Sequence, residues 1–354
     1  MERPAEVNKL VLPHIARMEG YVPGEQPQGG TFIKLNTNEN PYPPSPRVKQ
    51  ALIEAINDRL RLYPDPTARA FRETAAALHG VEPDMVLAGN GSDDALTILT
   101  RTFVGDGDLA AYPTPSYLLY STLISLQNGR AHVVPFSADW RLNADDIVRP
   151  GLKLVYLANP NSPSGTTIPP DEVAKLAERL PCPLIVDEAY GDFAATNCMA
   201  LPKTHPNVIV VRTFSKGYGL AGIRLGYLVA DARIVAELNK VKDSYNCDAL
   251  SLVAGKAALE DQAYLNETRS KILATRRRLT SALRELGYDV PDSHANFVWA
   301  TGGAKPAVET FQRMKQRNIF VRLMRYPDHA PGLRISVGTD AEIDGFLATL
   351  RELS

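Results

Sequence analysis

The sequence is poor in cysteine, nearly neutral in charge and free of long apolar runs. Its 354 residues include three cysteines, Cys182, Cys198 and Cys247, which lie far apart and form no C-x-x-C or Cys/His cluster. An odd number of distant cysteines argues against a disulfide framework, and the lack of a cluster argues against a metal site. A formal net charge of −1 provides no general attraction to nucleic acid or to an anionic membrane.

The chain also lacks the segments that direct proteins to or across a membrane. No run approaches the roughly 18 consecutive apolar residues that a membrane-spanning helix needs. The first residues, MERPAEVNKLVLPHIARMEGY, contain no unbroken apolar region of the kind found in secretion signals. We therefore expect a cytoplasmic protein that binds neither a membrane nor nucleic acid.

Between residues 84 and 230, short apolar runs alternate with helical patterns. The runs are MVLAG (85–89), DLAAYP (108–113), LKLVYLANP (152–160), PLIVDEA (183–189), VIVVRTF (208–214) and RLGYLVA (224–230). Runs rich in β-branched residues that alternate with helices are typical of a mostly parallel sheet with helices on both faces. We therefore predict an α/β fold for this part of the chain.

The pattern changes after residue 245. Residues 246–286 contain few helix breakers and predict one long helical stretch. The strand-like segments ANFVWA, IFVRL and LRISVG follow, with helical patterns over AVETFQRMKQRN and DAEIDGFLATLREL. We predict a large domain over 45–245 and a second unit, in which the proline-rich arm 1–44 accompanies a small α+β domain over 246–354.

The segment TFSKGYGLAGIRLGY contains G-x-G-x-x-G, formed by Gly217, Gly219 and Gly222, directly after an apolar run. A dinucleotide-binding loop of this form opens a crossover helix and is followed, about 20 positions later, by an acidic residue. Here the strand-like RLGYLVA begins directly after the loop, so no crossover helix fits. Lys216, immediately before the first glycine, favours a second interpretation, in which the lysine is held for covalent chemistry of its own.

A lysine of this kind is typical of enzymes that use pyridoxal phosphate, and such an enzyme needs several further groups. A carboxylate must keep the pyridine nitrogen protonated, and Asp187 is a candidate because it ends a buried strand. Tyr190 follows closely enough to bind a ring oxygen. The cofactor phosphate needs backbone N–H groups at the start of a helix. Gly91 in LAGNGSDDAL, with Ser92 as N-cap, predicts such a site.

Other residues complete this set. Thr213, Ser215 and Arg224 flank the lysine and can reach the same phosphate, and Tyr117 in PTPSYLLY can stack on the ring. Asn161 or Ser162, in the turn ANPNSPSG, can donate to the phenolic oxygen of the ring. Each residue has an ordinary structural explanation by itself, such as a core tyrosine, a helix cap, a turn or a surface ion pair. Their occurrence at successive strand ends of one sheet favours the cofactor.

With these residues, the chain resembles the fold-type I, aspartate-aminotransferase-like pyridoxal phosphate enzymes over nearly its whole length. The resemblance rests on the motifs IKLNTNENPYPPSP, LYPDP, GNGSDDAL, PTPSYLLY, NPNSPSG, VDEAY, TFSKGYGLAGIRLGY and GLRISVGT. It implies a mostly parallel, seven-stranded sheet between helices, plus a smaller α+β domain. Within this superfamily, KLNTNENPY and YPDP resemble the branch of histidinol-phosphate aminotransferases.

The resemblance also implies roles for individual residues. Lys216 would carry pyridoxal 5′-phosphate and move the proton of the substrate. The expected cofactor-binding residues are Gly91, Ser92, Asp93, Tyr117, Asn161, Ser162, Asp187, Tyr190, Thr213, Ser215, Lys216 and Arg224. Tyr63 in LYPDP would reach the cofactor of the neighbouring subunit, which implies a homodimer with shared active sites. The expected substrate-binding residues are Tyr21, Asn38, Arg322 and Arg334.

The activity implied by the resemblance is transfer of the amino group of histidinol phosphate to 2-oxoglutarate, in histidine biosynthesis. One pocket would accept a phosphate and a carboxylate, and a guanidinium fork binds both. Three alternatives stay open: another amino-acid aminotransferase, for instance one for aromatic residues, a threonine-phosphate decarboxylase, and a module that keeps the fold without the chemistry. The family has asparagine where this chain has Ser162, so the choice between Asn161 and Ser162 also stays open.

Overall fold

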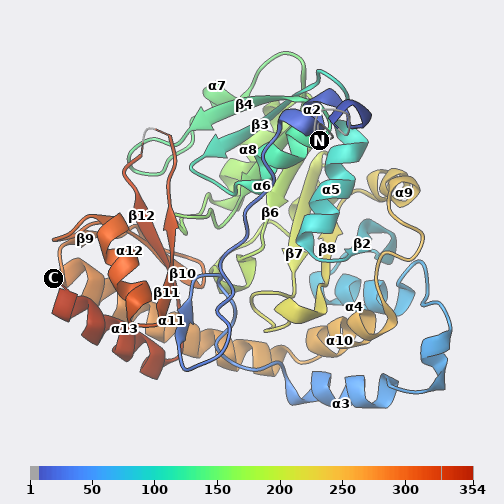
Figure 1. The fold of residues 1–354 in the computed structure, drawn as a ribbon. Coiled ribbons are helices and arrows are strands. Elements are labelled where there is room, and N and C mark those ends of the chain that lie inside the picture. The colour runs from blue at the N-terminus through green and yellow to red at the C-terminus, as the bar shows by residue number, and fades with distance from the viewer. Residues whose placement is uncertain (1–7, 328, 354) are drawn as a thin grey trace, which may run out of the picture.

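A seven-stranded sheet forms the centre of the larger part of the molecule, shown in the computed structural model of Figure 1, which describes residues 8–327 and 329–353. Its spatial order is β2-β8-β7-β6-β5-β3-β4. The strands are β2 (Val86–Gly89), β3 (Leu109–Thr114), β4 (Arg130–Pro135), β5 (Leu152–Ala158), β6 (Leu184–Asp187), β7 (Val208–Thr213) and β8 (Gly226–Val229). Strand β8 runs antiparallel to β2 and β7, whereas the other neighbours are parallel. The predicted α/β fold with a mostly parallel sheet is therefore confirmed.

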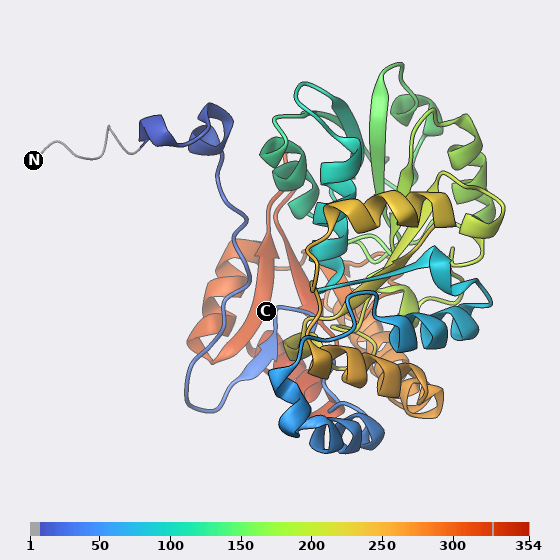
Figure 2. The same cartoon turned by 90° about the vertical axis from the view of Figure 1, so that its right-hand side faces the viewer.

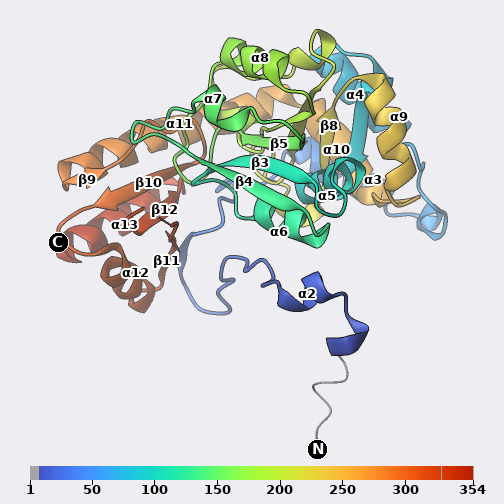
Figure 3. The same ribbon diagram turned by 90° about the horizontal axis from the view of Figure 1, so that it is seen from above.

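The central strands are apolar along their whole length because helices cover both faces of the sheet. Every residue of β6 and β7 is buried, and neighbours such as Val210 and Val211 belong to separate core clusters on opposite faces. One cluster includes side chains of α3 (Pro46–Ala55), α4 (Arg69–His79), α7 (Ala144–Ile147), α8 (Pro170–Arg179) and α10 (Ala249–Leu259). The other includes α5 (Ser92–Phe103), α6 (Leu119–Leu126) and α9 (Ala232–Val241). Figure 3 shows α7 and α8 on one side of strands β3 and β4, and α5 and α6 on the other.

A second, five-stranded sheet forms the smaller part, with the order β1-β11-β12-β10-β9. Its strands are β1 (Ile33–Leu35), β9 (Tyr288–Asp289), β10 (Phe297–Gly302), β11 (Ile319–Met324) and β12 (Gly332–Ser336). The helices α11 (Gln262–Glu285), α12 (Ala307–Gln316) and α13 (Asp340–Leu353) supply side chains to its core. Strand β1 comes from the N-terminal arm and pairs in parallel with β11, so the arm is built into this sheet.

The predicted single helical stretch over 246–286 is wrong, because two helices occupy it. Helix α10 ends at Leu259, and Asp261 caps the start of α11 by accepting a hydrogen bond from the backbone N–H of Tyr264. Helix α10 packs in the same cluster as the large sheet. The predicted domain boundary at residue 245 stays a prediction. The packing of α10 leads us to propose that the large domain continues to the end of α10.

Strand β4 was not predicted from the sequence. It lies at the edge of the large sheet, and most of its residues are exposed or half-buried. An edge strand of this kind has no continuous apolar run that would identify it. The short helix α2 (Pro13–Arg17) in the arm was not predicted either; it has no buried residues and projects from the body of the molecule in Figure 2. Across residues 8–327 and 329–353, no helix combines the length and the apolarity needed to span a membrane.

One half-buried histidine makes stability depend on pH. The Nε2 atom of His79, on α4, lies 2.7 Å from the hydroxyl oxygen of Tyr227. Burial, and then the positive charge of Arg212, lowers the pKa of His79 to about 4. The unfolded chain binds a proton to this imidazole below about pH 6.5, whereas the folded protein does not until about pH 4.

We therefore expect the free energy of unfolding to fall as the pH is lowered from 6.5 to 4, by up to about 3 kcal/mol from this group. Denaturant unfolding of the wild type and of His79→Gln at several pH values measures the difference between the two proteins. The difference should change across this window and stay constant above pH 7. Parallel curves over the whole range would contradict the assignment.

Candidate active site

One cavity gathers side chains from both sheets and from the arm, at the carboxyl ends of the parallel strands. The predicted site residues that line it are Tyr21, Ser92, Asp93, Tyr117, Ser162, Asp187, Tyr190, Thr213, Ser215, Lys216, Arg224, Arg322 and Arg334. Ligands of open α/β sheets bind at this edge. The cavity is also lined by residues that sequence reasoning missed, including Asn36, Thr37, Glu39 and Met324.

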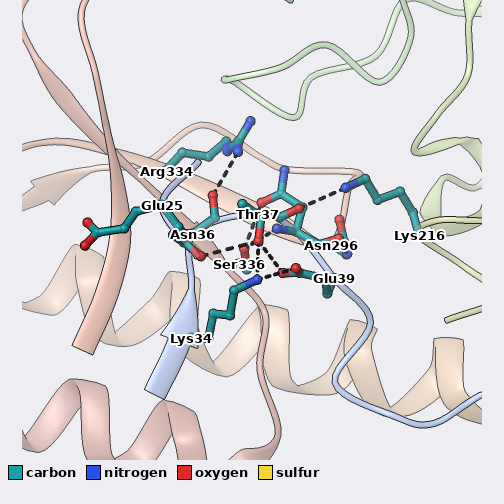
Figure 4. A network of polar contacts seen from close by, with 10 residues as sticks. Glu25, Lys34, Asn36, Thr37, Glu39, Lys216, Asn296, Arg334 and Ser336 are labelled. Atoms are coloured by element: carbon teal, nitrogen blue, oxygen red, sulfur yellow. Dashed lines mark hydrogen bonds and ion pairs between the residues drawn. The ribbon is translucent and has the colours of Figure 1, made fainter. Parts of the chain in front are cut away.

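Lys216 lies just beyond the end of β7, and its Nζ atom donates a hydrogen bond of 2.9 Å to the backbone oxygen of Thr37, as Figure 4 shows. Burial, and then the positive charge of Arg334, lowers the pKa of this amine to about 8. An amine with such a pKa is partly neutral near neutral pH. It can therefore act as a nucleophile or as a base.

The glycine after this lysine is required by packing. A Cβ atom at Gly217 would lie 2.3 Å from Oδ2 of Asp192. Asp192 is itself held by Arg212, whose Nη1 atom donates to Oδ1 at 2.7 Å, and Arg212 also donates from Nε to Glu188 at 2.9 Å. Only the short 3-10 helix Ala221–Ile223 separates β7 from β8. The prediction that no crossover helix follows the glycine loop is confirmed.

Replacement of Gly217 by alanine is therefore expected to lower the free energy of unfolding by about 1–3 kcal/mol, as overpacking of a close contact does. The methyl group would press on a carboxylate that Arg212 holds in place. Denaturant unfolding measures the loss. Gly222→Ala is the matched control, because no heavy atom lies within 4 Å of a Cβ at that position. Equal stability of the two variants would contradict this account of the loop.

Asp187 ends β6 and is only 4% exposed. Its Oδ2 accepts a hydrogen bond of 2.8 Å from the hydroxyl group of Tyr120, and its Oδ1 accepts one of 3.1 Å from the backbone N–H of Ala189. Burial raises the pKa of Asp187 to about 6, although these two hydrogen bonds act in the opposite direction. A buried carboxylate at a cavity wall is suited to pair with a cationic ring nitrogen. Tyr120 was not predicted as a site residue.

The start of α5 and Arg224 bring hydrogen-bond donors to one end of the cavity. The predicted N-cap at Ser92 is wrong, because Gly91 occupies this position with a φ of 92°, and no side chain caps the helix. A Cβ atom at residue 91 would lie 2.7 Å from Nη2 of Arg224. The Nη1 atom of Arg224 donates to the hydroxyl group of Ser215 at 3.2 Å. Uncapped N–H groups beside a guanidinium group attract anions.

The turn after β5 separates the two candidates for the ring oxygen. Asn161 is buried and does not line the cavity. Its amide accepts a hydrogen bond from Ser116 and donates to the backbone oxygen of Pro115 and to Ser164, so it braces the turn. Ser162 lines the cavity, and its hydroxyl oxygen accepts a hydrogen bond of 3.1 Å from Nη1 of Arg334.

Aromatic residues form part of the cavity wall. Tyr117 donates a hydrogen bond of 3.2 Å from its hydroxyl group to Asp93, and the ring of Tyr21 from the arm contacts it edge-on, with 6.0 Å between ring centroids. Tyr190 is not free, because Nδ2 of Asn38 donates to its hydroxyl oxygen at 3.0 Å. Asn38 itself does not line the cavity. Its predicted contact with a substrate therefore stays a prediction.

The arm also places a carboxylate in the cavity. Glu39 accepts hydrogen bonds from Thr37 and from the ammonium group of Lys34, as Figure 4 shows. Burial raises its pKa, but these hydrogen bonds and the charges of Lys34 and Lys216 outweigh that effect, so the pKa of Glu39 lies below its usual value. This charge partly balances the cations of the cavity.

Two arginines supply positive charge at the other end of the cavity. Arg334 donates from Nη2 to the backbone oxygen of Asn36 at 3.1 Å, but its buried Nε has no hydrogen-bond partner among the residues described. Arg322 donates to the backbone oxygens of Val22 and Pro23 in the arm. An unpaired, buried N–H group is unfavourable, so Arg334 is prepared to bind an anion.

Tyr63 does not line the cavity of its own chain. It is 81% exposed, and its ring stacks on that of Tyr245 with 4.4 Å between centroids. This exposure agrees with a contact to another subunit but does not test it.

Comparisons with known proteins agree with this geometry. Residues 30–350 match the sequence profile of the family described as aminotransferase class I and II. The chain is 52% identical to a histidinol-phosphate aminotransferase of Rhodopirellula baltica, over 94% of this chain and 92% of the relative. It is 45% identical to one of Syntrophotalea carbinolica, over 96% and 98% of the two chains. The chain is also similar to a solved structure, the crystal structure of histidinol-phosphate aminotransferase from Sinorhizobium meliloti in complex with pyridoxal-5′-phosphate. The TM-score is 0.84 and the identity 30%, over 91% of this chain and 92% of that one.

Proposed function

We propose, from the premise that this chain belongs to the class I and II aminotransferase family, that it uses pyridoxal 5′-phosphate to transfer the amino group of histidinol phosphate to 2-oxoglutarate. The products are imidazole acetol phosphate and glutamate, and the reaction serves histidine biosynthesis. The observation that carries the proposal is the convergence of Lys216, Asp187 and Arg334 on one cavity.

The residues of the cavity fit this cofactor. When bound, pyridoxal phosphate supplies an aldehyde that combines with amines and a protonated ring that withdraws electrons. The uncapped start of α5, together with Thr213, Ser215 and Arg224, provides donors for its phosphate. Asp187 provides the carboxylate for the ring nitrogen.

Polar and aromatic groups fit the rest of the ring. Ser162 and Tyr190 line the cavity with hydroxyl groups that can bind the phenolic oxygen of the ring. Asn161 is committed to bracing the turn, so we assign this role to Ser162. Tyr117 lines the same wall and provides the stacking ring.

Lys216 has two tasks in this proposal. Its partly neutral amine, with a pKa of about 8, would hold the cofactor by condensing with its aldehyde, with the release of water. Once the amine of the substrate took its place on the cofactor, the amine of Lys216 would be free to accept the proton of the substrate Cα. Burial, and then the neighbouring charge of Arg334, keeps the pKa of Lys216 low enough for both tasks.

The substrate end of the cavity favours an anionic amine. Arg334 offers an unpaired Nε, and Arg322 lies on the neighbouring strand, paired across the sheet with Arg334. Two guanidinium groups bind either a carboxylate or a phosphate. This suits an enzyme that must accept both glutamate and histidinol phosphate in one place.

A parallel assay tests the proposal. Purified protein with added pyridoxal phosphate is offered histidinol phosphate, phenylalanine or threonine phosphate, each with and without 2-oxoglutarate, and glutamate is measured. We expect the highest kcat/KM for histidinol phosphate and no turnover without 2-oxoglutarate. Preference for phenylalanine would indicate an aromatic aminotransferase. Consumption of threonine phosphate without 2-oxoglutarate would indicate a decarboxylase.

We also propose a homodimer with shared active sites. Apolar side chains that are exposed in the single chain include Ile53, Ile56, Leu60, Leu62 and Tyr63, on α3 and the segment after it. Several exposed apolar side chains in one short segment are typical of a subunit interface. The dimer would bring Tyr63 to the cofactor phosphate of the partner subunit.

Mixing two variants that each lack one group of the proposed site tests whether the site is shared. Tyr63→Phe removes the hydroxyl group and Lys216→Ala removes the amine, so each homodimer lacks one group in every site. A mixed dimer restores one complete site, with Lys216 from one chain and Tyr63 from the other. We expect activity to appear when the two variants are unfolded and refolded together. No gain over the separate variants would contradict the sharing of Tyr63.

We assign the reaction to the cytoplasm. The three cysteines, Cys182, Cys198 and Cys247, are free and buried, which supports a reducing compartment.

A further inference from the structure

Tyr120 lies behind the cavity and contacts its carboxylate directly. It belongs to the first turns of α6, is fully buried and does not line the cavity. Its hydroxyl group donates a hydrogen bond of 2.8 Å to Oδ2 of Asp187. The hydroxyl group of Tyr120 therefore acts on the cavity through this carboxylate, whereas its ring also contacts Tyr117 of the cavity wall, a contact that Tyr120→Phe would keep.

The ring of Tyr120 is held in a fixed orientation. It stacks on Tyr156 of β5, with 4.7 Å between centroids and 13° between the planes, and contacts Tyr117 edge-on at 5.6 Å. The hydroxyl groups of Tyr156 and Thr100 lie 2.5 Å apart, and Thr100 comes from α5. The ring contacts with Tyr156 and Tyr117 therefore fix the position from which the phenol donates to Asp187.

The surroundings of Asp187 disfavour its ionised form. Burial is the largest contribution, and the carboxylates of Asp93 on α5 and Glu188 after β6 add like charge. The phenols of Tyr117 and Tyr190 also lie near it. Among the residues described, Asp187 forms no ion pair, and its hydrogen-bond donors are Tyr120 and the backbone N–H of Ala189. Tyr120 is therefore the one side chain there that stabilises the negative charge by a hydrogen bond.

We propose that Tyr120 is a positioning residue that keeps Asp187 ionised and aimed into the cavity, and thereby ready to hold a cationic ring nitrogen. The second half of this inference rests on the proposed function, whereas the first half concerns the protein alone. A hydrogen bond from a phenol to a carboxylate favours the ionised form of the acid. Its loss is expected to make Asp187 about tenfold harder to ionise.

The test compares Tyr120→Phe with Tyr156→Phe in protein freed of cofactor. Both changes remove one buried hydroxyl group from the same stack, but only the first removes a donor to Asp187. Burial raises the pKa of Asp187 to about 6, so the folded protein holds this proton more tightly than the unfolded chain does. Protonation of Asp187 therefore adds to the free energy of unfolding at low pH, and this contribution is lost as the pH rises through 6. The free energy of unfolding is measured from pH 4 to pH 8 for the wild type and for each variant, with and without Asp187→Asn. The difference that Asp187→Asn makes reports the pH at which this loss ends.

We expect the loss to extend about one pH unit further in Tyr120→Phe and to stay unchanged in Tyr156→Phe. Coincident curves for the two variants would overturn the inference. If Tyr120→Phe does not fold, 3,5-difluorotyrosine at position 120 replaces it. This more acidic phenol should shift the loss in the opposite direction, and an unchanged curve would again overturn the inference.

A second readout uses added pyridoxal phosphate. We expect Tyr120→Phe to retain the cofactor about tenfold less well than Tyr156→Phe and to shift the pH dependence of its visible absorption. If the wild type bound no cofactor, the proposed function would fail, while the titration of the cofactor-free protein would still decide the role of Tyr120. If the wild type binds the cofactor and both variants match it, the second half of the inference is overturned.

Discussion

Lys216→Ala is expected to abolish amino-group transfer, with a loss of at least about 10⁴-fold in kcat. The change removes the amine that attacks the cofactor aldehyde and also the base that moves the substrate proton. Lys216 is the one lysine among the residues that line the cavity, and the ammonium group of the nearby Lys34 is engaged by Thr37 and Glu39. The start of α5 and Arg224 stay intact, so part of the cofactor binding should persist.

Steady-state assays with histidinol phosphate measure this loss. Lys175→Ala is the matched control, because that lysine is exposed on α8 and pairs with Asp171, far from the cavity residues. Borohydride treatment of the wild type with cofactor, followed by peptide mass mapping, should modify Lys216 alone. Wild-type rates in Lys216→Ala, or a modified lysine elsewhere, would contradict the assignment.

The strands were predictable wherever burial on both faces produced an apolar run. Strands β6 and β7 are buried throughout, and the sequence patterns around Asp187 and Lys216 therefore placed both residues at strand ends. Because parallel strands end at the same edge of a sheet, residues from separate strands were expected to meet there. The cavity contains both of them.

Contacts between distant elements were not predictable in the same way. Tyr120 follows Tyr117 by one helical turn and has no local pattern that distinguishes it from a core tyrosine. Its role depends on Asp187, which lies 67 positions later in the chain. Glu39 was missed for a similar reason, because the path of the arm across the cavity depends on the pairing of β1 with β11.

The choice between neighbouring polar residues also needed three-dimensional information. Asn161 and Ser162 are adjacent and both polar, so the sequence left the choice between them open. The structure commits the amide of Asn161 to Ser116, Pro115 and Ser164, and leaves Ser162 at the cavity wall. Likewise, the glycine of the loop at 217 is explained by the carboxylate of Asp192, a residue from another strand end.

The electrostatics of the site connect substrate binding to the catalytic amine. Arg334 is proposed to bind the anionic group of the substrate, and its charge also lowers the pKa of Lys216. Negative groups, chiefly Glu39 and Asp93, act in the opposite direction on the same amine. An anion bound at Arg334 would weaken the effect of the arginine. The amine should therefore become more basic when substrate is present, which favours uptake of the Cα proton.

Arg334→Gln is expected to lower kcat/KM for histidinol phosphate and for glutamate by about 10²–10³-fold, the effect of truncating a buried partner of a charged ligand. Glutamine is close in length but has neither the charge nor the fork that binds an anion with two parallel hydrogen bonds. Arg334→Lys restores the charge without the fork, so it should recover only part of the loss. Arg317→Gln is the control, because Arg317 is exposed and pairs with Glu352.

The same variants separate charge from geometry at Lys216. Burial and the charge of Arg334 lower the pKa of Lys216 to about 8, so the cofactor-free wild type should take up pyridoxal phosphate faster as the pH rises through 8. In Arg334→Gln this rise should move to higher pH, because a positive charge that disfavours the ammonium form is gone. In Arg334→Lys it should stay near its wild-type position. A tenfold or smaller loss of kcat/KM in Arg334→Gln, together with an unshifted uptake profile, would show that Arg334 neither binds the substrate anion nor tunes the amine.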